Sequence, residues 1–322
     1  MKAAVYQKYG TTEVLRIQQV EKPVPKDNEV LVKVNAASVN SWDWDLLRGK
    51  PFVVRLAGGG LFSPKKHILG CDIAGKIEAI GKNVKQFKIG DEVFGDISQC
   101  GWGGFAQYVC TKENSLIHKP AEITFETAAA IPQAGVMAYQ GIYDYGRVKS
   151  GQKILINGAG GGVGTFAIQM AKSCGAHVTG VDSKHKFDIM KSIGADHTIN
   201  YKQEDCTKTG QQYDLILDVV GHHSIYDFKR ALLPGGTYRM IGGHTNLIFQ
   251  SLLVGPLISI ITNKTMGILA HEPNKNLDTI LTLIKTGQIT PIVDQLFPLE
   301  KTAEALEYLG NGGVKGKIVI TM

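Results

Sequence analysis

The sequence predicts an α/β fold in which a doubly wound parallel sheet is joined to a smaller, mostly β domain. Two observations support this prediction. From residue 124 to residue 271, short apolar runs typical of strands alternate with helical patterns, as in a parallel sheet covered by helices on both faces. Before residue 124, short alternating runs separated by turns dominate and helical periodicity is scarce.

The first 123 residues are expected to form the first segment of the mostly β domain. Their alternating apolar runs predict strands, some entered through turns, at Glu29–Val34, Ile73–Ile80, Gly90–Gly95 and Phe105–Cys110. Within residues 272–322, the tail Gly287–Met322 returns to strands and turns, with one helix near Leu299–Leu309. We therefore expect this return segment to complete the first domain.

Residues 124–271 are expected to form the second domain, whose first helix has Thr124 as its candidate N-cap. Predicted strands lie at 153–157, 177–181, 197–200, 213–220, 237–241 and 264–270, and predicted helices at 165–174 and 186–193. The nearly apolar stretch Leu247–Ile261 is too short and too interrupted to span a membrane. It is either a core helix or an apolar wall facing the substrate or a second subunit.

Composition limits the classes of protein that fit. A chain of 322 residues with 43% apolar and 20% charged residues is typical of one large or two ordinary globular domains. The net charge of +6 comes without a basic run, so no nucleic-acid partner is expected. None of the five cysteines forms a C-x-x-C pair and no secretory signal precedes the first strand, which favours a cytoplasmic location.

A glycine-rich turn, Gly158–Gly164, follows one predicted strand and precedes a helix. Residues without a Cβ let backbone N–H groups approach a pyrophosphate, and the helix offers its positive N-terminal end to the same group. The spacing departs from strict G-x-G-x-x-G because Ala159 replaces the first glycine. We predict that a nicotinamide dinucleotide binds here. Its predicted contacts in the turn are Gly160, Gly161, Gly162 and Val163.

The end of the next strand gives conflicting signals about which dinucleotide binds. Asp182 is the acid that usually accepts hydrogen bonds from the adenosine ribose of NADH. Ser183, Lys184 and Lys186 suit the 2′-phosphate of NADPH instead, provided that the lysines offset the carboxylate charge. We expect NADPH, with NADH as the alternative.

A further signal lies at the end of the strand 213–220, which is expected beside the strand that enters the glycine turn. Ligands of doubly wound sheets bind at such a switch point. Val219 and Gly242 are therefore predicted cofactor contacts. Asp218 is interpreted as a structural hydrogen-bond acceptor rather than a catalytic group.

Several segments in the same order resemble the medium-chain dehydrogenase/reductase superfamily, specifically its zinc-independent quinone oxidoreductase branch. They are Ala37–Asp43, Gly70–Gly75, Gly90–Val93, Gly103–Tyr108, Ala159–Gly164 and Gly194–Tyr201. The resemblance covers essentially the whole chain. It implies a GroES-like catalytic domain built from both chain ends, a Rossmann domain between them, and a homodimer. It also implies contacts to the 2′-phosphate from Ser183, Lys186 and Tyr201.

The resemblance also bears on metal binding. Zinc-dependent relatives have a cysteine ligand where this chain has Ser38 and a histidine ligand where it has Cys71, and the third ligand position falls near Gln133. The four-cysteine lobe of those relatives is missing after Gly95. A catalytic zinc needs three protein ligands, so we predict no metal.

Without a metal to stabilise an alkoxide, an easier electrophile is expected. The resemblance implies an NAD(P)H-dependent reductase of quinones or α,β-unsaturated carbonyls, with Asn40 hydrogen-bonding the substrate carbonyl. Asp43 either orients a neighbouring group or only starts a helix, and both Tyr139 and solvent are candidate proton donors. The alternatives are an NADPH-binding protein with a structural or RNA-binding role and, less expected, a zinc alcohol dehydrogenase.

Overall fold

The computed structural model describes residues 1–322, apart from the side chains of residues 57 and 58. It divides into two compact units. Unit 1 comprises Met1–Gln133, Pro273–Lys275 and Ile292–Met322, and unit 2 comprises Ala134–Glu272 and Asn276–Pro291.

Unit 2 is built on a six-stranded sheet whose strands all run parallel. In spatial order the strands are β10 (His197–Asn200), β9 (His177–Asp182), β8 (Lys153–Asn157), β11 (Tyr213–Asp218), β12 (Leu232–Met240) and β13 (Thr265–Ile268). The chain starts in the middle of the sheet at β8, moves outward to β10, then returns to β11 and continues to the other edge. This is the strand order of the doubly wound dinucleotide-binding fold, as predicted.

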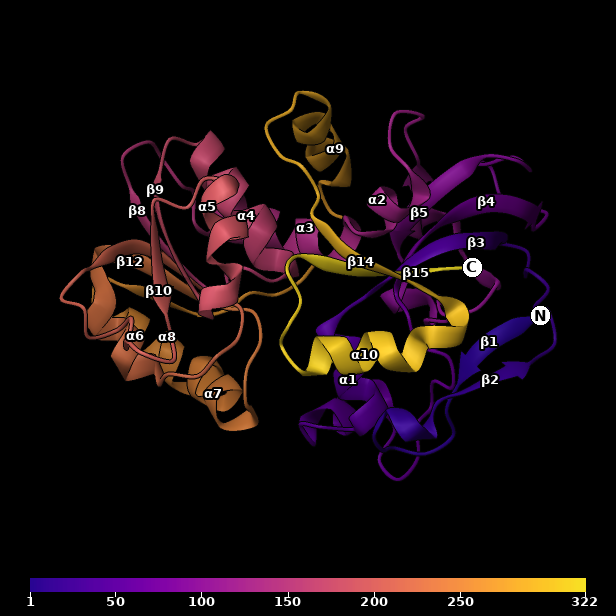
Figure 1. The fold of residues 1–322 in the computed structure, drawn as a ribbon, viewed down its shortest axis with the longest axis horizontal. Coiled ribbons are helices and arrows are strands. Elements are labelled where there is room, and N and C mark those ends of the chain that lie inside the picture. The colour runs from indigo at the N-terminus through magenta and orange to yellow at the C-terminus, as the bar shows by residue number, and fades with distance from the viewer. The chain divides into compact units, whose positions relative to one another are not determined.

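Helices lie on both faces of this sheet. The helices of unit 2 are α3 (Pro132–Tyr139, whose first two residues fall in unit 1), α4 (Gly162–Ser173), α5 (Phe187–Ser192), α6 (Ile225–Ala231), α7 (Thr245–Phe249), α8 (Gly255–Ile261) and α9 (Leu277–Lys285). In Figure 1, α4 and α5 lie on one side of the sheet and α6 and α8 on the other. Helix α4 begins inside the glycine-rich turn, earlier than the sequence pattern indicated.

The connection from β10 to β11, residues 201–212, contains no helix. A cavity of about 530 Å³ is lined by the first residues of four neighbouring strands, Lys153, His177, His197 and Tyr213. It therefore lies at the amino ends of these strands, whereas ligands of doubly wound sheets bind at the carboxyl ends.

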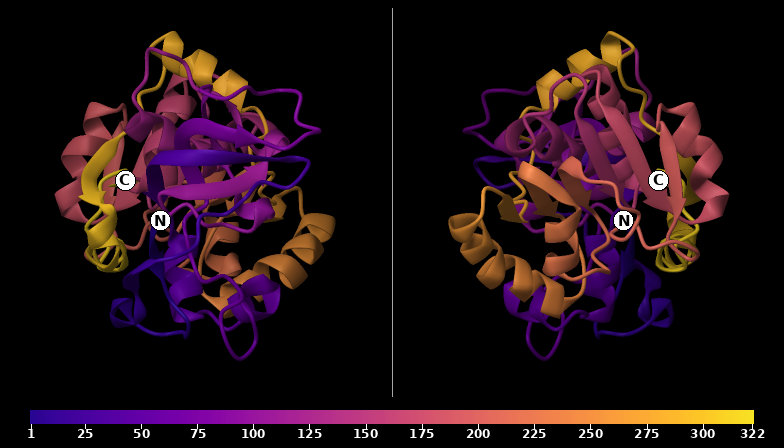
Figure 2. Two further views of the ribbon diagram at one scale, coloured as in Figure 1. Left: turned by 90° about the vertical axis from the view of Figure 1, so that its right-hand side faces the viewer. Right: turned by 90° about the vertical axis from the view of Figure 1, so that its left-hand side faces the viewer.

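Unit 1 contains a two-stranded sheet, β1 (Lys2–Val5) with β2 (Arg16–Gln19), and a seven-stranded sheet. The larger sheet has β3 (Glu29–Val39), β4 (Asp72–Ile80), β5 (Glu92–Asp96), β6 (Tyr108–Lys112), β7 (Ile117–His118), β14 (Val293–Pro298) and β15 (Lys317–Thr321). Its helices are α1 (Ser41–Arg48), α2 (Phe125–Ala129) and α10 (Thr302–Gly310). Strand β15, near the C-terminus, pairs antiparallel with β3, so the first segment and the return segment share the larger sheet. Both termini lie on the same side of unit 1 (Figure 2).

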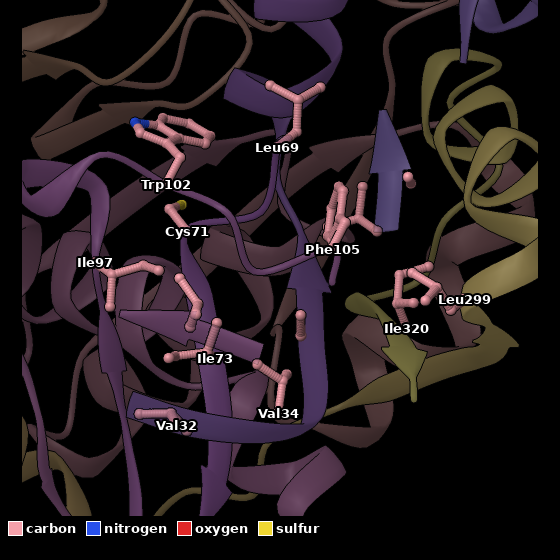
Figure 3. Packing of buried hydrophobic residues seen from close by; sticks show 14 of the residues in the cluster. Val32, Val34, Leu69, Cys71, Ile73, Ile97, Trp102, Phe105, Leu299 and Ile320 are labelled. Carbon is pink, nitrogen blue, oxygen red and sulfur yellow. The ribbon is translucent and has the colours of Figure 1, made fainter. Parts of the chain in front are cut away.

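The core of unit 1 follows from strand periodicity, because alternate residues of a strand point to the same face. Val30, Val32 and Val34 of β3 are all buried. Figure 3 shows Cys71 close to Trp102, within the same apolar cluster. Cys71 is therefore a core residue in its packing.

The unit boundaries differ from the expected domain boundaries in two places. Residues 124–133 belong to unit 1 because α2 packs on β3 and β4. Residues 276–291, which include α9, belong to unit 2. There the side-chain amide of Gln169 donates to Thr290 O and accepts from Thr290 N, at 3.0 and 2.8 Å.

The apolar stretch Leu247–Ile261 forms α7, a short π-helical segment and α8. Leu247 and Ile258 pack into the core of unit 2, whereas Leu253, Leu257, Ile260 and Ile261 are between 60 and 80% exposed. The stretch is therefore buried on one side only and is not a helix enclosed in the core. No helix in the described part of the chain is both long enough and apolar enough to cross a membrane.

Candidate functional site

The glycine-rich turn of unit 2 is tied to the neighbouring strand. Gly158 N and Ala159 N both donate to Val181 O of β9, at 2.9 and 3.1 Å. Gly158 has a φ of 84°, which favours glycine. A Cβ on Gly164 would lie 2.3 Å from Gly158 O, so α4 packs directly against the start of the turn.

The turn fits a pyrophosphate. Gly161 is the extended N-cap residue of α4, and the first N–H groups of a helix have no acceptor within the helix. A Cβ on Gly161 would meet only Gly158 O, at 3.5 Å, so the space in front of the turn is open. Of the predicted contacts, Gly160 N and Gly161 N already donate within the protein, to Asp182 Oδ2 at 3.0 Å and to Gly158 O at 3.2 Å. The N–H groups of Gly162 and Val163, in the first turn of α4, are therefore the donors suited to an anion.

Asp182 is held by the protein itself. Its Oδ2 accepts from Gly160 N at 3.0 Å and its Oδ1 accepts from Ser183 N at 2.8 Å. Lys186 Nζ lies 3.3 Å from Asp182 Oδ1, and both side chains are 9% exposed. The expected ribose acceptor and the expected phosphate-binding lysine therefore form a buried ion pair.

The remaining predicted adenosine contacts lie at the same edge of the sheet. The backbone N–H of Tyr201 donates to Asp182 O at 3.4 Å, and the Tyr201 side chain is 50% exposed. Its ring stacks on His222 with 6.5 Å between centroids, and His222 lies 5.8 Å from His244. Sequence reasoning did not single out these two histidines.

Asp218 is fully buried and binds three donors. Its carboxylate accepts from Asn157 Nδ2 at 2.7 Å, Gly221 N at 2.9 Å and Tyr238 Oη at 2.9 Å. These bonds fix the carboxyl ends of β8, β11 and β12 and the turn that contains Val219. The geometry is that of the structural acceptor that the sequence predicted.

In unit 1, Asn40 and Asp43 lie where β3 passes into α1. Asp43 is fully buried; its Oδ2 accepts from Asn40 N and its Oδ1 accepts from Gly70 N, both at 2.8 Å. Burial raises the pKa of Asp43 to about 7, although both hydrogen bonds oppose the shift. Asp43 therefore holds the Asn40 backbone and the loop at Gly70 together as well as starting the helix.

The Asn40 side chain lies between two opposite charges. Lys317 Nζ donates to Asn40 Oδ1 and, at 3.2 Å, to Val39 O. Asn40 Nδ2 donates to Asp72 Oδ2 at 3.0 Å and makes a weak 3.5 Å contact with Cys71 Sγ. Lys317 Nζ lies 3.7 Å from Asp72 Oδ2, and the two side chains are 3% and 0% exposed.

Tyr139, the candidate proton donor, belongs to unit 2. It is half-buried, and its ring centroid lies 4.6 Å from that of Tyr143. Its role stays a prediction, as do the roles of the other predicted contacts, Gly242 among them.

Comparisons with known proteins match the whole chain. Residues 26–121 match the family model of the alcohol dehydrogenase GroES-like domain, and residues 193–320 match that of the zinc-binding dehydrogenases. A chloroplast envelope quinone oxidoreductase homolog of Arabidopsis thaliana is 30% identical, over 99% of this chain and 98% of its own length. The chain belongs to the quinone oxidoreductase branch of the medium-chain dehydrogenase/reductase superfamily.

Two further comparisons agree with this family. A mitochondrial NAD(P)H oxidoreductase of Homo sapiens is 33% identical, over 100% of this chain and 89% of its own length. The structure of a quinone oxidoreductase from Coxiella burnetii superposes with a TM-score of 0.87, at 29% identity and over 100% and 99% of the two chains. This quinone oxidoreductase-like protein is thus an NAD(P)H-dependent oxidoreductase of a small molecule, with the predicted Rossmann and GroES-like folds.

The name of one matching family model implies zinc, and the residues at the expected position fit it poorly. Ser38 Oγ donates to Asp72 Oδ2 at 3.0 Å, and Gln133 Nε2 contacts Cys71 Sγ at 3.6 Å. Burial raises the pKa of the Cys71 thiol well above its ordinary value, which disfavours the thiolate that zinc requires. A dication near Asp72 would also face the ammonium of Lys317.

Two groups of side chains bring potential metal ligands within 4.8 Å of one another: Cys71, Asp72 and Asp96, and Asp205, Cys206 and His223. In the second group, Asp205 Oδ1 already accepts from Thr207 N and Oγ1, at 2.9 and 2.7 Å. Lys208 Nζ lies 3.1 Å from Asp205 Oδ2. Both oxygens of the Asp205 carboxylate therefore have partners within the protein, without a metal ion.

Sequence reasoning also missed Lys317 and Lys66. Lys317 is the first residue of β15, a position where a lysine usually reaches solvent. Lys66 Nζ lies 4.7 Å from the Trp102 ring centroid, and burial lowers its pKa. The position of Lys317 beside Asn40 follows only from the strand register, because β15 pairs Ile318 with Val39.

Proposed function

We propose that the protein is a zinc-independent reductase that transfers hydride from NADPH to a quinone or to the conjugated double bond of an α,β-unsaturated carbonyl. The observation that carries the proposal is the cluster around Asn40. The positive charge of this cluster is the buried ammonium of Lys317. The thiol of Cys71 and the carboxylate of Asp72 already have hydrogen-bonding partners. Such a cluster has donors for a carbonyl oxygen but little capacity to hold a Lewis-acid metal.

A bound NADPH supplies the hydride. When an enone accepts it at the β carbon, the electron pair moves onto the carbonyl oxygen, and one proton from solvent or an acid completes the saturated product. Asn40 Nδ2 supports this step by donating to the oxygen as its charge grows. The second hydrogen of Asn40 Nδ2 makes only the weak contact with Cys71 Sγ, and a substrate oxygen can replace Cys71 as its acceptor at least cost.

NADPH is proposed over NADH because Lys186 offsets the charge of Asp182. Lys184, Tyr201 and Lys202 remain exposed, the last two at the end of β10 and Lys184 at the end of β9. Cationic and hydroxyl groups in these positions suit a 2′-phosphate. Asp182 itself has both oxygens engaged, which weakens its value as an acceptor for ribose hydroxyls.

Steady-state oxidation of NADPH and NADH with a panel of quinones and enones tests the proposal, on protein whose metal content has been measured. We expect turnover that a chelator does not abolish and a higher kcat/KM with NADPH. Turnover that depends on bound zinc would favour an alcohol dehydrogenase. Tight NADPH binding without turnover on any acceptor would favour the non-catalytic alternative.

A homodimer is part of the proposal. β13 is an edge strand of the unit 2 sheet, with one row of backbone groups left without a partner strand in the described chain. The exposed apolar residues of α8 immediately precede it. A two-fold pairing of two β13 strands satisfies the backbone groups and covers apolar surface together. A cytoplasmic location stays a prediction, which fractionation of the producing cells tests.

A further inference from the structure

The ammonium of Lys317 is one of the most deeply buried charges in unit 1. Its side chain is 3% exposed, the fully buried carboxylate of Asp72 lies 3.7 Å away, and its charge also acts on the buried carboxyl group of Asp43. Burying an ion costs several kcal/mol unless geometry and partners compensate. The contacts of Lys317 are an amide oxygen, a backbone carbonyl and one carboxylate at 3.7 Å.

We propose that Lys317 is a positioning residue that fixes and polarises the Asn40 amide, so that a lysine ammonium does here what a metal ion does in zinc-dependent relatives. The inference rests on the proposed reductase function. It assigns to Lys317 a role in rate, acting through Asn40, beyond its contribution to folding.

The first part of the argument concerns orientation. An ammonium only donates hydrogen bonds and a carboxylate only accepts them. Lys317 on one side and Asp72 on the other therefore leave a single orientation of the Asn40 amide, with Oδ1 toward the lysine and Nδ2 toward the acid. Without the lysine, Oδ1 loses its charged partner, and only the hydrogen bond from Nδ2 to Asp72 still orients the amide.

The second part concerns donor strength. A cation at Oδ1 draws electron density from the amide and makes its N–H groups stronger donors. One of these N–H groups is the predicted donor to the substrate oxygen. Polarisation matters most when that oxygen carries the most negative charge, which is after hydride addition. The ammonium therefore stabilises the transition state more than the bound substrate.

The kinetic test compares Lys317→Met and Lys317→Arg with Lys119→Met. Lys119 is a matched control, because its side chain is 4% exposed and pairs with Glu92 at 3.0 Å, in the same unit but outside the cluster. We expect Lys317→Met to lower kcat at least about tenfold with little change in KM for NADPH. Lys317→Arg should restore part of the loss. Lys119→Met should leave kcat unchanged.

The choice of acceptor separates polarisation from simple damage. A weakly electrophilic enone depends on stabilisation of its oxygen more than a reactive quinone does. Lys317→Met should therefore reduce kcat more with the enone than with the quinone. An equal loss with both acceptors, or no greater loss than in Lys119→Met, would overturn the proposal.

A readout without turnover keeps this inference separate from the proposed function. In protein labelled with ¹⁵N-asparagine, the side-chain amide signal of Asn40 is assigned by its absence in Asn40→Asp. We expect Lys317→Met to shift this signal and accelerate its hydrogen exchange, and Lys119→Met to leave both unchanged. An unchanged signal in Lys317→Met would refute the role of Lys317, whether or not the protein reduces quinones.

Cobalt(II) tests the replacement of a metal directly, because its bond to a thiolate gives a visible charge-transfer band. We expect the purified protein to show no such band on titration with Co²⁺. A stoichiometric band that disappears in Cys71→Ser would show that a dication displaces the ammonium, and the proposal would fail.

Discussion

Asp182 and Lys186 form an ion pair with 3.3 Å between Nζ and Oδ1, and each side chain is only 9% exposed. The acid that suggests NADH and the base that suggests NADPH thus neutralise each other. Gly160 lies against both, because a Cβ there would come 2.7 Å from Lys186 Cβ and 3.2 Å from Asp182 Oδ2. We therefore expect cofactor preference to depend on the pair and not on either residue alone.

Removing one partner of this pair should change the preference. In Lys186→Met the Asp182 charge is uncompensated, so we expect the Kd for NADPH to rise about tenfold or more and that for NADH to rise less. In Asp182→Asn the lysine is released, and the ratio should move toward NADPH. Fluorescence titration with both dinucleotides measures these constants. Equal changes for both cofactors would mean that the pair only supports the turn.

The glycine turn offers a comparison between binding and folding. In Gly161→Ala the new methyl meets only Gly158 O at 3.5 Å, so it projects into the space where a pyrophosphate approaches. We expect an unchanged Tm and a loss of dinucleotide binding of at least about tenfold. In Gly164→Ala the methyl lies 2.3 Å from Gly158 O, and Tm itself should fall. Normal binding by a stable Gly161→Ala would contradict the assignment.

Asp43 should make stability depend on pH. Burial raises its pKa from 3.8 to about 7 in the folded protein, which therefore holds one more proton than the unfolded chain between these values. Its stabilising contribution is fully present below about pH 3.8 and is lost as the pH rises through about 7.

Urea unfolding at about pH 5 and about pH 8 checks this expectation. The free energy of unfolding of the wild type should fall by about 2–3 kcal/mol more than that of Asp43→Asn, which has no proton to lose. The variant should be less stable at both pH values, because an amide N–H group then faces Asn40 N or Gly70 N. Parallel pH profiles would show that the carboxyl group is ionised throughout.

The exposed apolar residues of α8 predict which substitution disrupts the proposed dimer. Ile260 is 80% exposed, and Ile260→Lys places a charge in the proposed contact. We expect the wild type to sediment as a dimer at micromolar concentration and the variant as a monomer. Ile89→Lys is the control, since Ile89 is 65% exposed in unit 1. A monomeric wild type would rule out the dimer.

Local signals in the sequence predicted the sheet of unit 2 well. The apolar runs at 153–157 and 197–200 coincide with β8 and β10, and Thr124 caps α2 by accepting from Thr127 N. These features depend on neighbouring residues, so periodicity and capping chemistry reveal them.

Long-range contacts were not predictable in this way. Lys317 meets Asn40 across 277 positions of the chain, and its role depends on the register of β15 against β3. Whether Asp182 faces a ribose or Lys186 likewise depends on side-chain conformation, because the same sequence permits both. The exposure of Leu257 could not be read from its apolar neighbours, which favour a core and a contact surface equally.

The place of β15 in the chain has a consequence for synthesis and folding. Unit 2 is nearly continuous, so its sheet can form while the chain is still emerging from the ribosome. The Asn40 cluster needs a strand that follows all of unit 2, and contacts of such high sequence separation form slowly. A nascent chain stalled before residue 317 would thus contain a complete glycine turn and an Asn40 amide without its ammonium. Competence for cofactor binding should appear earlier than competence for reduction during biosynthesis.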